Sequence, residues 1–192
     1  MGGVCTNLNS VNTFETTEPI KRGNKIITIS RARTNVFEIK INNFIYKLLK
    51  CHNEIRKKYN LPELVENLDL HFFAEIYAKE FFKNNEIYIY KPNIYKGMYL
   101  GENVIISGTK EPEEIFERLS IEEKDYARNS NEFSKSVAHF TQVISKDTTD
   151  IGVGLWADKA QKKYCTVILY YPIGNILWKK KYLKNGLICI IK

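Results

Sequence analysis

The sequence has little of what marks an exported or membrane-spanning chain. No apolar run approaches the roughly 18 residues that a bilayer-spanning helix needs. The first residues, MGGVCTNLNSVNT, lack the apolar segment of a secretory signal, and the chain contains no Asn-x-Ser/Thr glycosylation sequon. We therefore expect a chain that is made in the cytosol and is not glycosylated.

Cysteine is also scarce, and its spacing excludes two kinds of site. The four cysteines, at positions 5, 51, 165 and 189, form no CxxC pair and no dense framework, so we expect reduced thiols rather than disulfides. Gly152, Gly154 and Ala157 match the GxGxxG/A spacing of dinucleotide-binding loops, but a second strand follows them where that motif needs a helix. We interpret them as glycines in a tightly packed strand.

What the sequence does contain predicts a folded domain with a basic balance. Hydrophobic residues make up 44% of the chain and aromatic residues 12%, which is enough to form a core. The net charge of +7 favours anionic partners, and much of it lies in the flanking segments, in Lys21–Arg33 and near the C-terminus. We expect no nucleic-acid partner, because the chain has no nucleic-acid recognition motif.

The hydrophobic pattern predicts an α+β domain between two extensions. Residues 1–33 read as a flexible basic leader with one short β-like stretch, Ile26–Ile29, and residues 179–192 as a basic and apolar C-terminal extension. The elements expected between them are a helix from Thr34 or Asn35 to near Asn60, a helix from near Asn67 to Asn84, a helix from Thr109 as N-cap to about Tyr126, and a hairpin of strands 151–156 and 164–171.

Three polar residues stand in otherwise apolar surroundings. They are Glu102 in GEN, Glu122 in LSIEEKDY and His139 in HFTQVIS. Two carboxylates and an imidazole form a metal or acid-base site if the fold brings them together. The other interpretation is that the carboxylates lie scattered on the surface and the histidine belongs to the core.

Five segments, in order, resemble the CAP superfamily, the group of cysteine-rich secretory proteins, antigen 5 and pathogenesis-related proteins that is also called SCP/TAPS or venom-allergen-like. They are HNEIR (52–56), GEN (101–103), the LxxExxxY of Leu119 to Tyr126, HFTQVISKDTTDIGVG (139–154) and YYPIGNI (170–176). The resemblance implies a CAP/SCP domain over residues 34–178. It also implies an α-β-α sandwich, with a small antiparallel sheet between helical layers and a central cleft.

The resemblance also implies a cleft site of two histidines and two glutamates that can hold Zn. Glu102, Glu122 and His139 match three of these positions, but no histidine occurs between His71 and His139 to supply the fourth. Two further departures are Leu119 and Ser145, where the family usually has tryptophan. We therefore expect no required cofactor and only weak Zn binding, with the three residues forming a polar floor of the cleft. His52 and His71 have no family ligand role here and are interpreted as structural.

An aromatic loop and an acylation motif point towards lipid. Tyr88, Tyr90 and Tyr95 resemble the caveolin-binding type of stretch in sterol-binding family members, although plain packing of tyrosines onto the domain gives the same pattern. MGGVCT fits N-myristoylation at Gly2, with Cys5 as a palmitoylation site and the basic leader as a further membrane signal. The chain is similar in this to the leaderless Golgi-associated pathogenesis-related-like branch.

We expect a non-enzymatic CAP-domain protein on the cytosolic face of the Golgi or plasma membrane. Its cleft and aromatic loop would bind lipid, sterol or a protein partner, including a second copy in a homodimer, and unconventional secretion stays open. The alternative is a divalent-metal-dependent hydrolase that uses Glu102, Glu122 and His139. The missing fourth ligand and the absence of a nucleophile recognisably paired with His139 argue against it.

Overall fold

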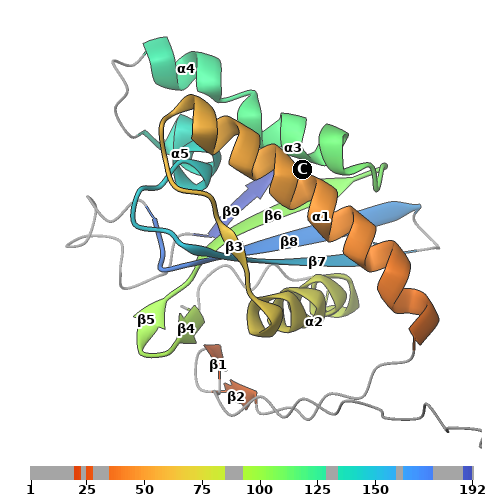
Figure 1. Ribbon diagram of the computed structural model, residues 1–192. Coiled ribbons are helices and arrows are strands. Elements are labelled where there is room, and N and C mark those ends of the chain that lie inside the picture. Colours follow the sequence, from red (N-terminus) through yellow and green to blue (C-terminus); the bar gives the residue numbers. More distant parts are fainter. Residues whose placement is uncertain are drawn as a thin grey trace, which may run out of the picture.

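A computed structural model of the chain (Figure 1) describes residues 20–22, 25–27, 35–84, 93–128, 134–158, 162–174 and 188–191. Side chains are described within residues 43–81, 94–128, 134–158 and 162–174. The predicted leader beyond its two short strands, and most of the C-terminal extension, lie outside the described residues.

A five-stranded sheet forms the middle layer, in the order β3-β7-β8-β6-β9. Its strands are β3 (Val65–Glu66), β7 (Asp150–Asp158), β8 (Lys163–Tyr171), β6 (Gly101–Ser107) and β9 (Ile188–Ile191). The three central strands are antiparallel, whereas β3 and β9 join the two edges in parallel. The sheet is therefore mixed rather than wholly antiparallel.

Helices cover both faces of this sheet, as the α-β-α expectation requires. In Figure 1, α2 (Leu68–Asn84) lies on one face, and α1 (Asn35–Lys58), α3 (Pro112–Ser120) and α5 (Ala138–Val143) lie on the other. Alternate residues of β8 divide between two hydrophobic cores: Val167 and Leu169 pack with α2, and Ile168 packs with α1 and α3. The fold is α+β, as the sequence predicted.

α2 lies directly on the backbone of β7. A Cβ atom added at Gly152 would approach the carbonyl carbon of Leu70 to 2.2 Å, and one at Gly154 would approach that of Ala74 to 2.1 Å. Only glycine allows a helix to come this close to a strand. The two glycines are therefore packing residues, as the sequence analysis interpreted them, and not a phosphate-binding loop.

His71 of α2 extends the outer edge of β7 beyond the two-residue strand β3. The backbone N–H of Asn67, directly after β3, donates to the Ile151 carbonyl at 2.9 Å. The next N–H along this edge, that of Val153, donates to His71 Nδ1 at 2.7 Å. His71 Nε2 lies 3.0 Å from the carboxylate of Glu66, so His71 joins α2, β3 and β7. This confirms a structural role for His71.

A second, smaller sheet has the order β2-β1-β4-β5, with β1 (Ile20–Arg22), β2 (Lys25–Ile27), β4 (Asn93–Tyr95) and β5 (Met98–Tyr99). β1 pairs with β4 in antiparallel register, with Lys21 opposite Ile94. Within the expected leader, residues 20–22 and 25–27 thus form strands, the second of which overlaps the β-like stretch expected at Ile26–Ile29. These residues are strands because β4 offers a free edge with which β1 can pair.

The predicted third helix is two helices. α3 begins after Glu111, not at Thr109, because Pro112 is suited to the first helical turn. Thr109 instead accepts a hydrogen bond on Oγ1 from the Glu111 N–H. α4 (Glu123–Arg128) then starts after a break at residues 121–122, so Glu122 lies between two helices rather than on the face of one.

Candidate functional site

Glu122 and His139 form the pair at the centre of the candidate site. Nδ1 of His139 donates to Oε1 of Glu122 at 2.5 Å, and the other carboxylate oxygen accepts the Phe140 N–H at 2.9 Å. Each side chain is 14% exposed. His139 Nε2 is buried and finds no hydrogen-bond partner among the described residues. In a neutral imidazole with the proton on Nδ1, Nε2 presents a lone pair.

Glu102 does not join this pair. It stands opposite Leu169 on β8, and the pleat points it to the α2 face, whereas α5 lies on the other face. Burial, and then the negative charge of Glu102, raise the pKa of the Cys165 thiol to about 12, which places Glu102 with Cys165 on the α2 side. Within the described residues, no three His, Cys, Asp or Glu side chains are grouped so that they could hold a metal ion.

A chain of buried hydrogen bonds runs along the α1 side of the sheet beside the pair. His52 Nδ1 donates to the Leu48 carbonyl at 2.7 Å, and its Nε2 lies 2.9 Å from the Tyr170 hydroxyl. Asn103 Nδ2 donates to the same hydroxyl at 3.2 Å and to the His139 carbonyl at 3.4 Å. Four of the five quoted motifs are thereby joined, those of His52, Asn103, His139 and Tyr170.

His52 is neutral in this network. Complete burial lowers its pKa from 6.5 to about 4, and the nearby Arg56 charge acts in the same direction. The hydrogen-bond pattern agrees. The Leu48 carbonyl can only accept a hydrogen bond, so Nδ1 of His52 carries the proton, and Nε2 accepts a hydrogen bond from the Tyr170 hydroxyl. The structural interpretation of His52 is confirmed.

Arg56 closes one end of the domain, and no carboxylate partner for it occurs in the part of the chain that the structure describes. It is fully buried, and its guanidinium donates to the carbonyls of Pro62, Val143, Ser145 and Thr148 over 2.8 to 3.1 Å. Desolvation lowers the pKa of the guanidinium from its ordinary value. One side chain of α1 thus fixes the loop that leads from α5 to β7.

Gln142 adds further contacts among these motifs at this end of the sheet. Its Oε1 accepts the Gly174 N–H at 3.0 Å, and its Nε2 donates to Thr148 Oγ1 at 3.3 Å. A Cβ atom at Gly101 would come within 2.3 Å of Gln142 Oε1, so the glycine of GEN makes room for this amide. The motifs therefore hold one another in place.

Arg56, Asn103 and Gln142 lie within the quoted motifs, but the sequence alone predicted no role for them. A signal for Arg56 was present, because Leu48, His52 and Arg56 recur every four residues along the apolar stripe of α1. A charged residue on a buried stripe needs partners from elsewhere in the fold. The partners of Asn103 and Gln142 depend on tertiary contacts that no local pattern carries.

The predicted lipid-loop residues are only partly described. Tyr95 is 1% exposed, donates its hydroxyl proton to Asp69 Oδ2 at 2.9 Å and packs edge-on against the Tyr171 ring. This is the packing alternative, and it removes Tyr95 from the surface that a lipid could reach. Tyr88 and Tyr90, like Gly2 and Cys5, lie outside the described residues.

The described donors do not make a tight Zn site. His139 Nε2 has the open lone pair of a ligand, and the Glu122 contact at Nδ1 is the usual orienting partner of such a histidine. A closed site needs four donors and a catalytic site three. Since Glu102 is turned to the other face, His139 offers a single donor atom.

The sequence profile described as "CAP: Cysteine-rich secretory protein family" matches residues 49–170. The chain belongs to the CAP family. All five motifs that suggested the resemblance begin or end within this range, and the family accounts for the sandwich of helices around the sheet.

A human CAP relative and solved CAP structures agree with this membership. The chain is 30% identical over 135 residues to "Golgi-associated plant pathogenesis-related protein 1" of Homo sapiens, covering 70% of this chain and 86% of the relative. It is 24% identical to "Secreted protein RBT4" of Candida albicans, covering 72% of this chain but 37% of that protein.

Among structures, venom allergen-like protein 4 of Schistosoma mansoni superposes with a TM-score of 0.52 at 23% identity, over 74% of this chain and 92% of that one. A structure described as NaASP2 with Zn2+ gives a TM-score of 0.51 at 19% identity, over 68% and 80% of the two chains. At these identities the likeness shows the fold alone.

Proposed function

We propose that the chain is a non-enzymatic CAP-domain protein that associates with a membrane and binds a lipid or sterol there. The non-enzymatic role is supported by the hydrogen bonds of the motif side chains. Both carboxylate oxygens of Glu122 are bonded within the protein, and Arg56, Asn103 and Gln142 join parts of the fold. These groups hold a scaffold together rather than face a substrate.

Membrane association is supported by the name of one relative and by two features of the chain. The human relative carries "Golgi-associated" in its name. The N-terminal MGGVCT fits acylation at Gly2 and Cys5, and the net charge is +7. No helix among the described residues is long and apolar enough to cross a bilayer. A lipid chain at Gly2 together with basic residues would then attach the protein to the cytosolic face of the Golgi or plasma membrane.

Co-sedimentation of the purified, unacylated chain with liposomes tests lipid binding. Liposomes with and without sterol and anionic lipid are compared for the wild type, Tyr90→Ala and, as a matched control, Tyr46→Ala, since Tyr46 is an exposed tyrosine of α1. We expect binding that is weakened by Tyr90→Ala and unchanged by Tyr46→Ala. Absence of binding to every liposome would direct the search to acylation and a protein partner.

A metal-dependent hydrolase is the second candidate function, because His139 Nε2 has no hydrogen-bond partner among the described residues and could bind a metal ion. Isothermal titration with Zn decides between the two, with His139→Gln as the control. We expect no binding at micromolar Zn, because His139 lacks two further described donors. Tight binding that disappears in His139→Gln would favour the hydrolase instead.

A further inference from the structure

The β4–β5 hairpin ends in a tip formed by Lys96, Gly97 and Met98. Lys96 and Gly97 have φ values of 47° and 77°, and positive φ at both central residues is typical of a type I′ turn. A Cβ atom at Gly97 would meet no atom within 4 Å, so the turn projects into open space. Lys96 is exposed and Met98 is 45% exposed. The tip thus presents one cation and one long apolar side chain.

The base of this hairpin is fixed to the domain on both strands. On β4, the buried Tyr95 is hydrogen-bonded to Asp69 of α2, and its ring centroid lies 5.3 Å from that of Tyr171. On β5, the Tyr99 carbonyl accepts the Ile173 N–H at 3.1 Å. The tip is therefore held at a defined place relative to α2 and β8.

The small sheet that contains the hairpin carries basic residues and no acidic ones. Residues 20–27 and 93–99 contain no Asp or Glu, and their four charged residues are Lys21, Arg22, Lys25 and Lys96. Backbone pairing of β1 with β4 brings the first three of these residues into the same sheet as the hairpin. Four positive charges, and no acidic residue within these two stretches, make this sheet favour an anionic surface.

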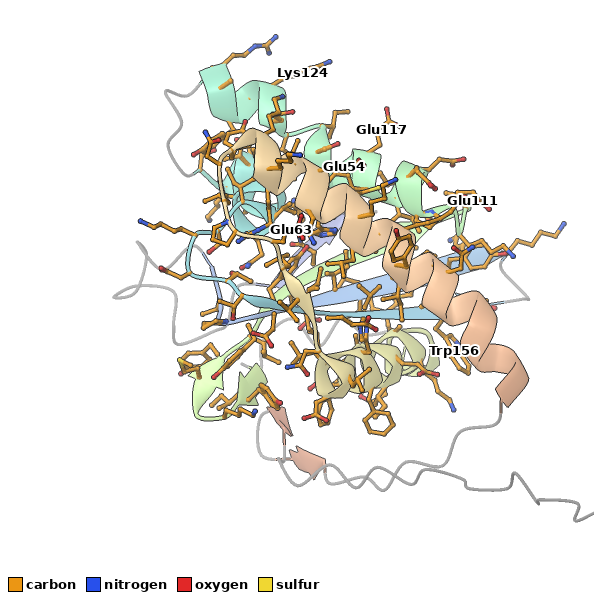
Figure 2. The ribbon with its side chains drawn as sticks, viewed as in Figure 1. Glu54, Glu63, Glu111, Glu117, Lys124 and Trp156 are labelled. Atoms are coloured by element: carbon orange, nitrogen blue, oxygen red, sulfur yellow. The ribbon has the colours of Figure 1, made fainter. Side chains whose placement is uncertain are left out.

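α3, across the central sheet, has the reverse balance, whereas α1 beside it carries six basic and two acidic residues. Residues 111–120, which include α3, carry four glutamates and one arginine. Figure 2 shows Glu54, Glu111 and Glu117 around α1 and α3, across the central sheet from the small sheet labelled in Figure 1. A negatively charged surface would therefore attract the small sheet and repel α3.

Given the membrane association proposed above, we propose that the small sheet is the face that contacts the bilayer, and that it recognises anionic lipid headgroups. The four basic residues attract the headgroup phosphates, and Met98 enters the boundary between headgroups and acyl chains. The Lys96 stem lies along the Tyr95 ring, with Nζ 5.2 Å from the ring centroid, and can extend towards a phosphate without a change in the backbone.

Vesicle binding by a pair of matched variants tests this assignment. Lys96→Glu/Met98→Asp alters the tip. Lys124→Glu/Ile121→Asp makes the same change of charge and polarity in α4 and in the break before it, where Lys124 is exposed and Ile121 is 64% exposed. Figure 2 shows Lys124 at the far end of the domain from the hairpin. Lys96→Asn serves as a milder variant, because asparagine tolerates positive φ. Far-UV circular dichroism and the unfolding midpoint confirm that each variant is folded.

The full-length, unacylated chain is titrated with vesicles of phosphatidylcholine and of phosphatidylcholine with phosphatidylserine. We expect the tip variant to bind the anionic vesicles at least about tenfold more weakly than the wild type, Lys96→Asn to fall between them, and the α4 variant to match the wild type. Added salt should weaken wild-type binding.

Each other outcome separates this inference from the proposed function. Three results would overturn the assignment of the small sheet and leave membrane binding intact. The tip variant could bind as well as the wild type, the α4 variant could lose binding as well, or the wild type could bind vesicles without anionic lipid. If the wild type binds no vesicle, both the assignment and direct lipid binding fail.

Discussion

At the scale of single residues, His52 links the stability of the domain to pH. Its pKa is lowered to about 4 by burial, so the folded chain excludes a proton that the unfolded chain binds below pH 6.5. A group with a lowered pKa of this kind makes the folded state less stable as the pH falls between these two values. A shift of this size corresponds to about 3 kcal/mol.

We therefore expect the free energy of unfolding of the wild type to decrease between pH 7 and pH 4.5, and that of His52→Gln to decrease by less. Urea denaturation at both values measures the difference. His52→Gln has a lower stability at pH 7, because Leu48 and Tyr170 lose part of their hydrogen bonding. Equal pH dependence in the two proteins would contradict a neutral His52.

At the scale of elements, the contact between α2 and β7 depends on glycine. Gly154→Ala would place a methyl group against the backbone of Ala74, which cannot move without displacing the helix. We expect a loss of at least about 2 kcal/mol in the free energy of unfolding. Gly108→Ala is the control, since its Cβ atom would meet nothing within 4 Å, and it should change stability by less than about 0.5 kcal/mol. Chemical denaturation of both variants measures the contrast.

The sequence predicted those elements whose residues follow a clear hydrophobic pattern. α1 and α2 were predicted within a few residues, because their buried residues recur at helical spacing, and β7 and β8 were predicted as a hairpin. β6 was missed because Gly101–Ile105 is buried on both faces, so the strand has no alternation. The break at Glu122 was missed because its cause is tertiary: the carboxylate bonds to His139, 17 residues away.

In the candidate site, too, the sequence motifs indicated the residues but not all of their contacts. The motifs indicated Glu122 and His139, and the structure pairs them. The motifs also indicated Glu102, but whether it faces this pair depends on the register of β6 against β8, which places it opposite Leu169 and on the α2 face. Sequence spacing carries no information about that register.

At the scale of the whole molecule, β9 extends the sheet beyond the matched family region. The strand pairs with residues 102–105 of β6, and it lies 18 positions after the last matched residue, since the match ends at 170 and β9 begins at 188. Without β9, β6 becomes an edge strand that contains the apolar run Val104 to Ile106 and no proline or lysine. Such an edge readily pairs with other chains.

We expect deletion of residues 188–192 to cause aggregation that deletion of Lys192 alone does not. Light scattering at increasing protein concentration measures the aggregation. Hydrogen exchange should also become faster at the β6 amides that β9 bonds. A truncated chain that stays monomeric, with β6 amides as slow as in the full chain, would show that β9 is dispensable.

His71 has a comparable consequence at the other edge of the sheet. The Val153 N–H already donates a hydrogen bond to the His71 imidazole. It is therefore not available to a strand that would pair with β7 next to β3. A helix side chain there acts as a terminator of strand addition. Strand addition next to the two-residue β3 is therefore blocked at Val153.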